Sequence, residues 1–371
     1  MKQALFSVII ALSRGAYFLL RHILPRSNSV VFLSRQSDSP SPDFRLLRSE
    51  LRRQAPELKQ RCFCRRMDGA SLRDLLWLIK PTLALLRARG CFVDGQCIPL
   101  SLYSQRPGFV AVQVWHALGA IKKFGKQILD SPDGHSSREA KLWNMHAHYS
   151  FIPCASAATQ VSYCEAFGYP PQSVPILGMP RVDELLRLLG DEESHGKIFA
   201  AHPTWRGMKK ILYVPTFRKG KPLELSPLLK VLTPEKRRKY KLIVKVHPND
   251  EAPAAPADVA LTSIPTYELF AVADAIVTDY SAAAIEASLA GKPLYFYVPD
   301  LDEYCQSTGL NVHLEEEMPG AVFKDFAELM NAVESESYDY SALERFKEKY
   351  IETADTRNTE RIVAEFLGRL G

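Results

Sequence analysis

The sequence predicts an α/β protein built from two open parallel sheets that face each other across a cleft. Short apolar runs typical of buried strands alternate with runs of helix-forming residues along most of the chain. The pattern is clearest where a strand at 275–278, a helix at 282–290 and a strand at 294–298 follow one another. Such a strand–helix–strand unit within one sheet is parallel and right-handed. At 371 residues, the chain is long enough for two Rossmann-like domains.

The charge of the chain is unevenly distributed. The net charge is +5, yet residues 1–100 hold 17 Lys and Arg against 7 Asp and Glu, so the remaining residues are net acidic. A basic amino-terminal third suggests an anionic partner, either lipid headgroups or nucleic acid. The seven cysteines show no CxxC pair and no metal-type spacing, so we expect free thiols in a reducing cytosol and no metal site.

Residues 1–27 are expected to form an amphipathic helix at an anionic membrane surface. Arg14 and Arg21 interrupt the apolar run at 4–24, so no uninterrupted stretch is long enough to span a bilayer. No small-residue cleavage site follows, which argues against a secretory signal. On a helix, both arginines share one stripe with Ser7 while apolar residues cover much of the rest, which suits arginines among headgroups. The alternative is a helix packed against the protein's own core.

Residues 28–205 are predicted to form the first Rossmann-like domain. The expected strands lie at 30–34, 91–94, 110–114 and 147–153, and the expected helices at 45–54, 72–89 and 160–167. Residues 176–183 should leave a strand in a turn that Pro180 presets. The helix at 45–54 is strongly basic, but aromatic platforms and groove-reading motifs are missing. We therefore predict a solvated or lipid-facing helix and no nucleic-acid partner.

Three residues of this part of the chain are candidates for chemistry. His116 follows the alternating strand at 110–114, and Lys122 lies in the loop or helix start beyond it. A histidine at such a strand end suits a general base beside an anionic substrate, although a structural histidine is the alternative. Arg181 follows the strand exit at 176–178, where its guanidinium can bind phosphate or pair with Asp183.

Residues 206–371 are predicted to form a second domain of the same kind. The expected strands lie at 211–215, 242–246, 259–262, 275–278 and 294–298, and the expected helices at 266–273 and 282–290. Residues 339–370 are expected to be largely helical, whereas periodicity fades around 190–210.

Residues suited to phosphate chemistry follow the strands of the second domain. Thr216 and Arg218 follow 211–215, and His247 follows 242–246. Ser281 is expected to cap the helix at 282–290, whose free backbone N–H groups and dipole favour phosphate. A capped helix in an ordinary core is the alternative. Because such residues recur at the carboxyl ends of strands in both domains, the sequence predicts a transferase-like site that holds phosphate.

Five segments, in order over about residues 110–305, resemble the CDP-glycerol glycerophosphotransferase family of teichoic acid primases and polymerases. They are WHALGAIKKFG (115–125), GMPRVDEL (178–185), LYVPTFR (212–218), VKVHP (244–248) and VTDYSAAAIEASLAGKPLYFYVPDLDEY (277–304). The resemblance implies a GT-B fold in which the second domain holds most of the donor. It also implies transfer of glycerol phosphate, or ribitol phosphate in relatives, from a CDP-alditol to a hydroxyl of a lipid-linked acceptor. Such enzymes release CMP at the cytoplasmic face of the membrane, and we expect no cofactor.

The resemblance also implies roles for individual residues. His116 and His247 match the two motif histidines of the family; we assign His116 as the general base and His247, with Arg218, to the donor diphosphate. Thr216, Asp279, Ser281 and Glu286 are assigned to donor binding, and Lys122 and Arg181 to the acceptor or a phosphate. A solvated helix charge is the alternative for Glu286. The chain departs from the family pattern at Ala117 (Gly), Ala282 (Ser), Glu286 (Asp) and Thr308 (Arg), with the residue usual in the family in parentheses.

Two other functions share part of this pattern. A GT-B glycosyltransferase that uses a nucleotide-sugar would have the same fold but not this set of five motifs. A non-catalytic membrane-associated binding protein would share the basic amino terminus, yet it gives no reason for two histidines at matching strand exits.

Overall fold

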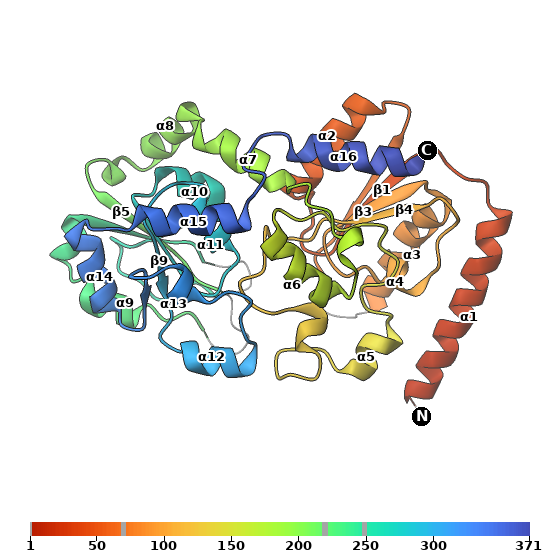
Figure 1. Cartoon of the computed structure of the whole chain (residues 1–371), viewed down its shortest axis with the longest axis horizontal. Helices are drawn as coiled ribbons and strands as arrows, with labels where there is room; N and C mark the ends of the chain where they lie inside the picture. The colour runs from red at the N-terminus through yellow and green to blue at the C-terminus, as the bar shows by residue number, and fades with distance from the viewer. Residues whose placement is uncertain (1, 68–71, 217–221, 247–250) are drawn as a thin grey trace. The chain divides into compact units, whose positions relative to one another are not determined.

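The computed structural model describes residues 2–67, 72–216, 222–246 and 251–371 (Figure 1). Contacts divide the chain into unit 1 (Met1–His116, Phe124–Asp183 and Asp355–Gly371) and unit 2 (Ala117–Lys123 and Glu184–Ala354). The sequence placed one boundary between residues 205 and 206 and set residues 1–27 apart. The structure instead places the amino-terminal helix and the last 17 residues in unit 1, because the apolar side of that last segment packs into the core of unit 1.

Unit 1 is built on a four-stranded parallel sheet with the order β2-β1-β3-β4. Its strands are β1 (Ser29–Ser34), β2 (Lys59–Cys64), β3 (Gly90–Val93) and β4 (Val110–Gln113). Its helices are α1 (Lys2–Ile23), α2 (Pro42–Gln54), α3 (Leu72–Arg87), α4 (Ile98–Leu102), α5 (Ser137–Leu142), α6 (Ala157–Phe167) and α16 (Asn358–Leu370). β1, β3 and β4 were predicted, whereas β2 was not, because this edge strand is half exposed and carries few apolar residues. The strand expected at 147–153 is reduced to one isolated bridge, that of Phe151 with Val112.

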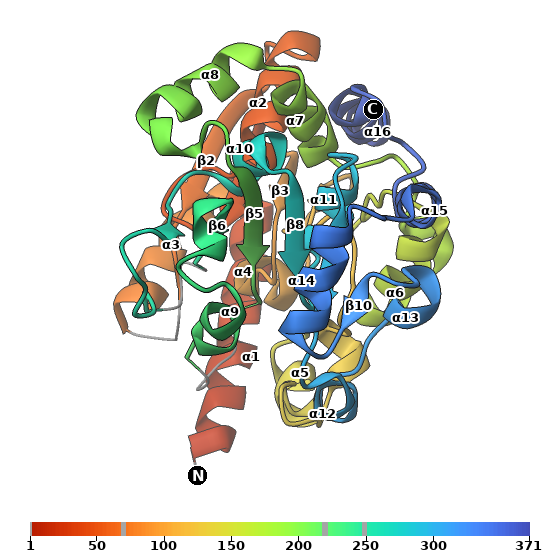
Figure 2. The ribbon, with the colours of Figure 1, turned by 90° about the vertical axis from the view of Figure 1, so that its left-hand side faces the viewer.

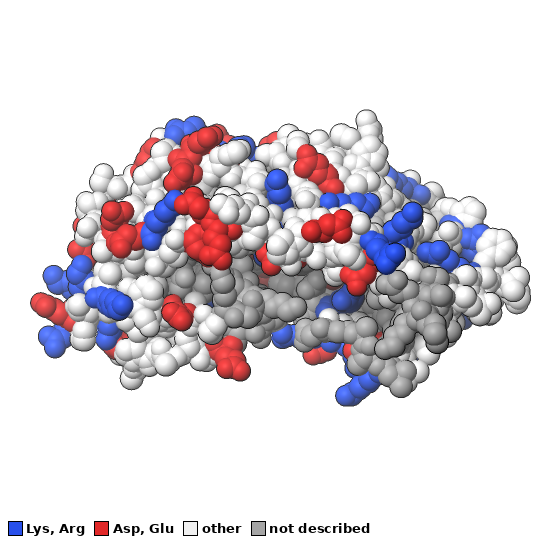
Figure 3. All heavy atoms as spheres, turned by 90° about the horizontal axis from the view of Figure 1, so that it is seen from below, with Lys and Arg blue, Asp and Glu red and all other residues white. Residues whose placement is uncertain are grey.

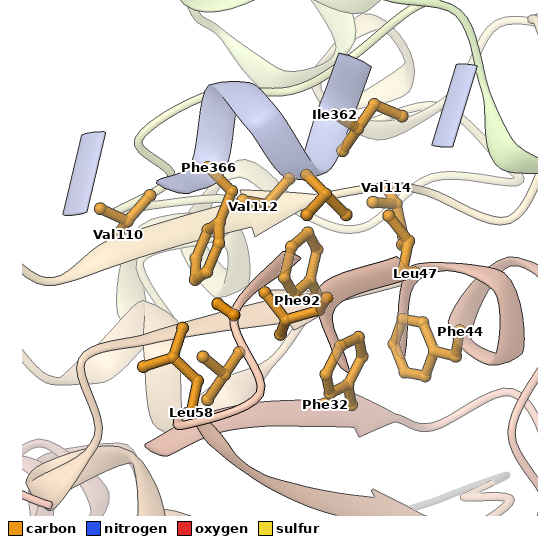
Figure 4. Packing of buried hydrophobic residues seen from close by; sticks show 14 of the residues in the cluster. Phe32, Phe44, Leu47, Leu58, Phe92, Val110, Val112, Val114, Ile362 and Phe366 are labelled. Carbon is orange, nitrogen blue, oxygen red and sulfur yellow. The ribbon is translucent and has the colours of Figure 1, made fainter. Parts of the chain in front are cut away.

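The core of unit 1 is a stack of aromatic rings between the sheet and two helices (Figure 4). The ring of Phe92 on β3 lies 5.0 Å from that of Phe32 on β1 and 4.7 Å from that of Phe366 on α16. Phe44, on the apolar side of α2, contacts Phe32 edge-on. Helix α2, predicted as a basic helix at 45–54, therefore exposes Arg45, Arg52 and Arg53 and buries its other side. Helices α2 and α16 lie side by side over the sheet.

Unit 2 is built on a six-stranded parallel sheet with the order β10-β9-β8-β5-β6-β7. Figure 2 shows its central strands β5 and β8. Its strands are β5 (Lys209–Val214), β6 (Tyr240–Val244), β7 (Ala260–Leu261), β8 (Ala275–Thr278), β9 (Leu294–Tyr297) and β10 (Val322–Phe323). Its helices are α8 (Glu192–Ala201), α9 (Ser226–Val231), α10 (Thr266–Val272), α11 (Ala283–Ser288), α12 (Leu301–Ser307), α13 (Leu314–Glu317), α14 (Phe326–Ser335) and α15 (Tyr340–Tyr350). The five strands predicted for this domain are confirmed within two residues at either end.

Helix α7 (Pro180–Leu189) occupies a region that the sequence suggested was a turn. Pro180 stands at the first helical position, where a residue without an N–H group is well tolerated. Helix α8 follows where periodicity fades, capped by the Asp191 carboxylate, which accepts a hydrogen bond from the Ser194 N–H. Helix α7 does have an apolar stripe, since Val182, Leu185 and Leu188 are buried; it was missed because Pro180 was read as a turn signal. Helix α8 was missed because it lacks such a stripe: Ile198 is its one buried residue, and the Asp191 cap is its clearest feature.

Asp183 caps helix α16. The sequence had suggested a different contact for it, an ion pair with Arg181. Its carboxylate accepts hydrogen bonds from the backbone N–H groups of Asn358 (3.1 Å) and Thr359 (2.8 Å). It also accepts from the side chains of the same two residues, at 2.7 and 2.5 Å. A carboxylate at a helix N-terminus satisfies free N–H groups and interacts favourably with the helix dipole. This residue therefore fixes the start of a helix 175 positions away in sequence.

Replacing Asp183 should destabilise unit 1 through the loss of this cap. We expect Asp183→Ala to lower the free energy of unfolding by roughly 1–3 kcal/mol, because partly buried donors lose their acceptor. Urea unfolding followed by circular dichroism measures the change. Glu184→Ala is the matched control, since its surface pair with Arg187 contributes under about 1 kcal/mol. Equal midpoints for the two variants would contradict the capping role.

Candidate active site

His116 lies directly beyond β4 and is held in one tautomer. Its Nδ1 is 2.9 Å from the backbone oxygen of Asp94, which follows β3. A carbonyl oxygen can only accept, so Nδ1 carries the proton and the lone pair of the neutral ring is on Nε2. The amide nitrogen of Gln36 is farther from Nδ1, at 3.4 Å. With an exposed ring and a basic Nε2, His116 meets the chemical requirement for a general base.

The residue before His116 adopts an unusual backbone conformation. Trp115 has φ +49°, a left-handed conformation rarely adopted by a bulky residue. The Trp115 N–H donates to the side-chain oxygen of Gln113 (2.9 Å), and its ring stacks on that of Phe124 at 4.8 Å. Gln113 is fully buried and also donates to the Gly95 carbonyl. Strain of this kind persists where the surroundings hold it and clusters at functional sites. The polar Gln113 within an apolar strand was the available sequence signal, and it was missed.

Asp94 is a second residue of this strand edge that sequence reasoning missed. Its side chain is 3% exposed, and burial raises the pKa of its carboxyl to about 7 despite a hydrogen bond from Ser34. Its Oδ1 has no hydrogen-bond partner among the described residues. The backbone oxygen of the same residue contacts His116, so a carboxyl with a strongly raised pKa belongs to the residue that holds the candidate base.

Arg181 is engaged in a buried ion pair within unit 1. Its guanidinium lies 2.5 Å from the carboxylate of Asp43, in the first turn of α2. Both side chains are almost fully buried. The ion-pair alternative is therefore confirmed with a different partner from the one expected, and a role of Arg181 in binding phosphate stays a prediction.

In unit 2, Asp279 and Thr216 join the ends of two neighbouring strands. Asp279 follows β8 and Thr216 lies beyond β5; the Asp279 carboxylate accepts the Thr216 N–H at 3.0 Å and the Thr216 hydroxyl at 2.5 Å. Asp279 is buried, so this contact sets where the chain leaves β5. Two expected donor-binding residues are thus brought together. Arg218 and His247, which should extend the same edge, lie outside the described residues.

Ser281 accepts a hydrogen bond from the Ala283 N–H (3.2 Å) at the start of α11. The helix is shorter than the predicted one, spanning Ala283–Ser288, and the residue at its N-cap position is Ala282. A helix of six residues contributes only a small dipole, so local N–H groups matter more than predicted. Glu286 on this helix is 7% exposed, which makes the solvated-charge alternative wrong.

An aromatic pair supports this strand end and was not predicted. The ring of Tyr280 is fully buried and stacks on that of Tyr304 in α12, with centroids 3.8 Å apart and planes inclined by 7°. The Tyr280 hydroxyl lies 3.0 Å from a carboxylate oxygen of Asp300. The stack attaches α12 to the residue between Asp279 and Ser281, and so positions both.

The segment after His116 belongs to unit 2 and carries Lys122. The Lys123 N–H donates to the Gly309 carbonyl at 3.0 Å, and the Asn311 N–H donates to the Ile121 carbonyl at 2.8 Å. The side-chain amide of Asn311 also donates to the Lys122 carbonyl at 3.2 Å. The backbone of Lys122 is therefore anchored while its side chain is exposed, and its contact with a substrate stays a prediction.

The cysteines are free, as the sequence predicted. The sulfur atoms of Cys62 and Cys64 on β2 lie 3.6 Å apart and form a weak hydrogen bond. Over the described part of the chain, no group of three or more His, Cys, Asp or Glu residues is arranged to hold a metal ion.

Comparison with known proteins places this chain in a family. A family model described as CDP-glycerol:poly(glycerophosphate) glycerophosphotransferase matches residues 16–367. The teichoic acid ribitol-phosphate primase of Bacillus spizizenii is 32% identical and covers 99% of this chain and 98% of its own length. The teichoic acid glycerol-phosphate primase of the same organism is 26% identical over 74% of this chain and 73% of its own length.

Solved structures show the same fold. The wall teichoic acid polymerase TagF superposes with a TM-score of 0.73 at 16% identity, over 100% of this chain and 97% of the TagF chain. The UDP-GlcNAc 2-epimerase from Neisseria meningitidis superposes with a TM-score of 0.59 at 14% identity, covering 92% of this chain and all of that one. The predicted GT-B-like α/β fold with parallel sheets is confirmed. Because the family model matches nearly the whole chain, this protein belongs to the CDP-glycerol glycerophosphotransferase family, which includes the teichoic acid primases and polymerases.

Proposed function

We propose that this protein transfers an alditol phosphate from a CDP-alditol to a hydroxyl of a lipid-linked acceptor at the cytoplasmic face of the membrane, releasing CMP. The observation that carries the proposal is the 2.9 Å contact of His116 Nδ1 with the Asp94 carbonyl, which favours the tautomer with the lone pair on Nε2. Family membership supplies the reaction class. A nucleotide-sugar glycosyltransferase or a non-catalytic binding protein would not need this arrangement together with the family's motifs.

In the proposed reaction, His116 Nε2 removes the proton from the acceptor hydroxyl. The resulting oxygen attacks the alditol-side phosphorus of the donor, the bond to the bridging oxygen breaks, and CMP leaves with the electron pair. Phosphoryl-type transfer depends mainly on positioning and on neutralising charge. Trp115 and the Asp94 carbonyl act as positioning groups for the base, because they fix the ring without carrying the proton.

We assign the donor to the strand ends of unit 2. Asp279 holds Thr216 in place, and the hydroxyl of Ser281 lies beside the first turn of α11. Glu286, buried in the same helix, accepts a hydrogen bond from a ribose or alditol hydroxyl in this proposal. His247 and Arg218 bind the diphosphate, and Lys122 and Arg181 bind the acceptor or a phosphate; these four assignments rest on the resemblance and on residue chemistry.

Glycerol phosphate is the group expected from the sequence, and ribitol phosphate is a second candidate. The family description names glycerol, and one TagF structure was obtained from a crystal soaked with CDPG. The ribitol-phosphate primase of Bacillus spizizenii matches this chain over almost its full length. Both alditols must therefore be included in any test.

The membrane part of the proposal rests on the apolar surface of α1 and α3. Ten of the thirteen large hydrophobic side chains exposed among the described residues lie on these two helices. They are Val8, Ile9, Leu12, Phe18, Leu19, Leu20, Ile23, Leu76, Ile79 and Leu83. Within the described residues, no helix has the length and apolar character needed to cross a bilayer. At the right of Figure 3, where α1 lies in Figure 1, uncharged atoms adjoin Lys and Arg, which suits an anionic lipid surface.

The orientation of α1 differs from the expected one. Arg14 donates to the Leu102 carbonyl at 3.0 Å, and Arg21 donates to the Ser104 carbonyl at 2.9 Å. Tyr17 is buried on the same side. The helix therefore packs on unit 1 through its arginine stripe, and its apolar side is exposed. The sequence had offered a helix with its arginines among lipid headgroups or a helix packed on the protein core, and each alternative describes only part of this arrangement.

The reaction can be tested by mixing purified protein with CDP-glycerol or CDP-ribitol and a membrane lipid extract and measuring CMP release. We expect release with one of the two donors, and His116→Ala should lower it by about 10²–10⁴-fold while CDP affinity changes little. His313→Ala is the control, because that histidine is exposed and outside the site. Near-normal turnover of the His116→Ala variant would show that His116 is a structural residue. A loss of CDP affinity as large as the loss of turnover would show that His116 binds the donor.

A pair of variants tests the donor side. Ser281→Ala should weaken CDP binding only moderately, because the backbone donors remain. Ser281→Asp should weaken it by more than about tenfold, since a carboxylate would stand where phosphate binds. Aspartate can still accept the Ala283 N–H, so thermal melting should be unchanged and serves as the folding control. If the Ser281→Asp variant melts normally and binds CDP as tightly as the parent, the donor phosphate does not bind beside Ser281.

The membrane role can be tested by replacing exposed apolar residues of α1. Leu12, Leu19 and Ile23 are 70%, 62% and 74% exposed, so a triple change to Gln should leave folding intact. We expect binding to vesicles of phosphatidylcholine and phosphatidylglycerol to weaken at least about tenfold, because apolar area no longer enters the lipid. Val161→Gln on α6 is the control, as it changes an equally exposed residue elsewhere on unit 1. Unchanged vesicle sedimentation of the triple variant would place membrane association elsewhere.

A further inference from the structure

A polar cavity of about 460 Å³ lies in unit 1, between α1 and the segments around residues 102–104 and 141–148. Its size is within the range of small-ligand sites, roughly 300–1,000 Å³. The residues that line it are Arg14, Tyr17, Phe18, Arg21, Leu102, Tyr103, Ser104, Lys141, Asn144 and His148. Three carry a permanent positive charge, and none of these lining residues is an Asp or Glu. The cavity is therefore a place of uncompensated positive charge.

The bonding of the cationic groups supports this description. Arg14 and Arg21 donate to the backbone carbonyls of residues 102, 104 and 105, which carry no net charge to oppose theirs. Arg21 Nε is buried without an acceptor among the described residues. Lys141 is exposed and makes no ion pair with any described residue. A second cavity, of about 380 Å³ in unit 2, has one lysine, Lys197, and one glutamate, Glu268, in its lining, so it lacks this imbalance.

The walls of the cavity are fixed. Tyr17 stacks on Tyr103 with ring centroids 4.5 Å apart, which joins α1 to the end of α4. On the other side, Asn144 donates to the Ser101 carbonyl at 3.0 Å. Asn144 and His148 both have left-handed backbones, at φ +48° and +69°, so the loop is held in a conformation that has a cost.

The cavity adjoins the exposed apolar side of α1. Phe18 belongs to both: it lines the cavity, and it is one of the exposed hydrophobic residues of the helix. The Arg21 guanidinium lies 4.4 Å from the centre of its ring. A ligand with an anionic head and an apolar tail could place the head in the cavity and the tail along α1.

We propose that this cavity binds the phosphate of a membrane lipid. The proposal rests on the membrane association of α1 proposed above and adds a specific site for a phosphate head. Two lipids carry this chemistry, an anionic phospholipid of the bilayer and the phosphate-bearing end of a polyprenyl-linked acceptor. Arg14, Arg21 and Lys141 supply the charge and donors, while Phe18 meets the first apolar part of the lipid.

A charge-reversal variant with a matched control tests the site. Lys141→Glu should weaken binding to vesicles that contain the bound lipid at least about tenfold, because the new negative charge stands at the phosphate position. Lys59→Glu makes the same change in net charge on β2, which does not line the cavity, and should weaken binding less than about twofold. The vesicles are phosphatidylcholine alone, with phosphatidylglycerol, or with a polyprenyl phosphate. A selective loss on phosphatidylglycerol identifies a bilayer phospholipid, and a selective loss on polyprenyl phosphate identifies the acceptor lipid.

A second measurement does not depend on vesicle association. Burial and the nearby Arg14 lower the pKa of His148, so an anion bound in the cavity should raise it. Nuclear magnetic resonance of the His148 ring, titrated with a short-chain phosphatidylglycerol or with inorganic phosphate, follows this change. Equal losses for Lys141→Glu and Lys59→Glu, an unmoved His148, or inorganic phosphate binding as tightly as lipid would each overturn the proposal. Because no CDP-alditol is present, the result is independent of transferase activity.

Discussion

Parallel strands end at one edge of a sheet, and each end leaves backbone groups that the sheet no longer pairs. In this protein the candidate active-site residues satisfy those groups. The Asp94 carbonyl beyond β3 accepts from the ring of His116 beyond β4, and the Asp279 carboxylate beyond β8 accepts the N–H of Thr216 beyond β5. The need to pair these strand ends therefore also positions the groups that the proposed chemistry requires.

The orientation of helix α1 reflects a balance between packing and exposure. A helix that packs on a globular unit ordinarily buries its apolar side. Here Tyr17 and the arginine stripe face unit 1, and guanidinium groups donate to carbonyls, while Leu12, Leu19 and Ile23 are exposed. Exposing such a surface to water is unfavourable, so this orientation of α1 supports the membrane contact proposed above.

Much of the fold could be predicted because buried parallel strands have a strong local signal. β8, for example, is a fully buried run that the apolar pattern identified to the residue. Edge strand β2 was missed because its residues are half exposed, and helix α8 because its cap is its clearest feature. The order of motifs likewise selected His116 as a candidate, but periodicity could not show which way the Arg14 stripe faces. The partner of Arg181 was beyond prediction for another reason: it is 138 positions away, and no local pattern encodes that distance.

The departures from the family pattern differ in physical consequence. Ala117 stands where a glycine is usual in the family. Its backbone does not have a positive φ, which in this segment occurs at Trp115, so alanine fits at 117 without strain. Ala282 has an ordinary helical backbone, and the neighbouring Ser281 already accepts the Ala283 N–H. Glu286 is different, because its side chain is buried and one methylene longer than the usual aspartate. In a packed interior an extra methylene moves the carboxylate and whatever it binds. If the proposed contact of Glu286 with a donor hydroxyl holds, this residue is where the chain's choice of alditol would differ from that of its relatives.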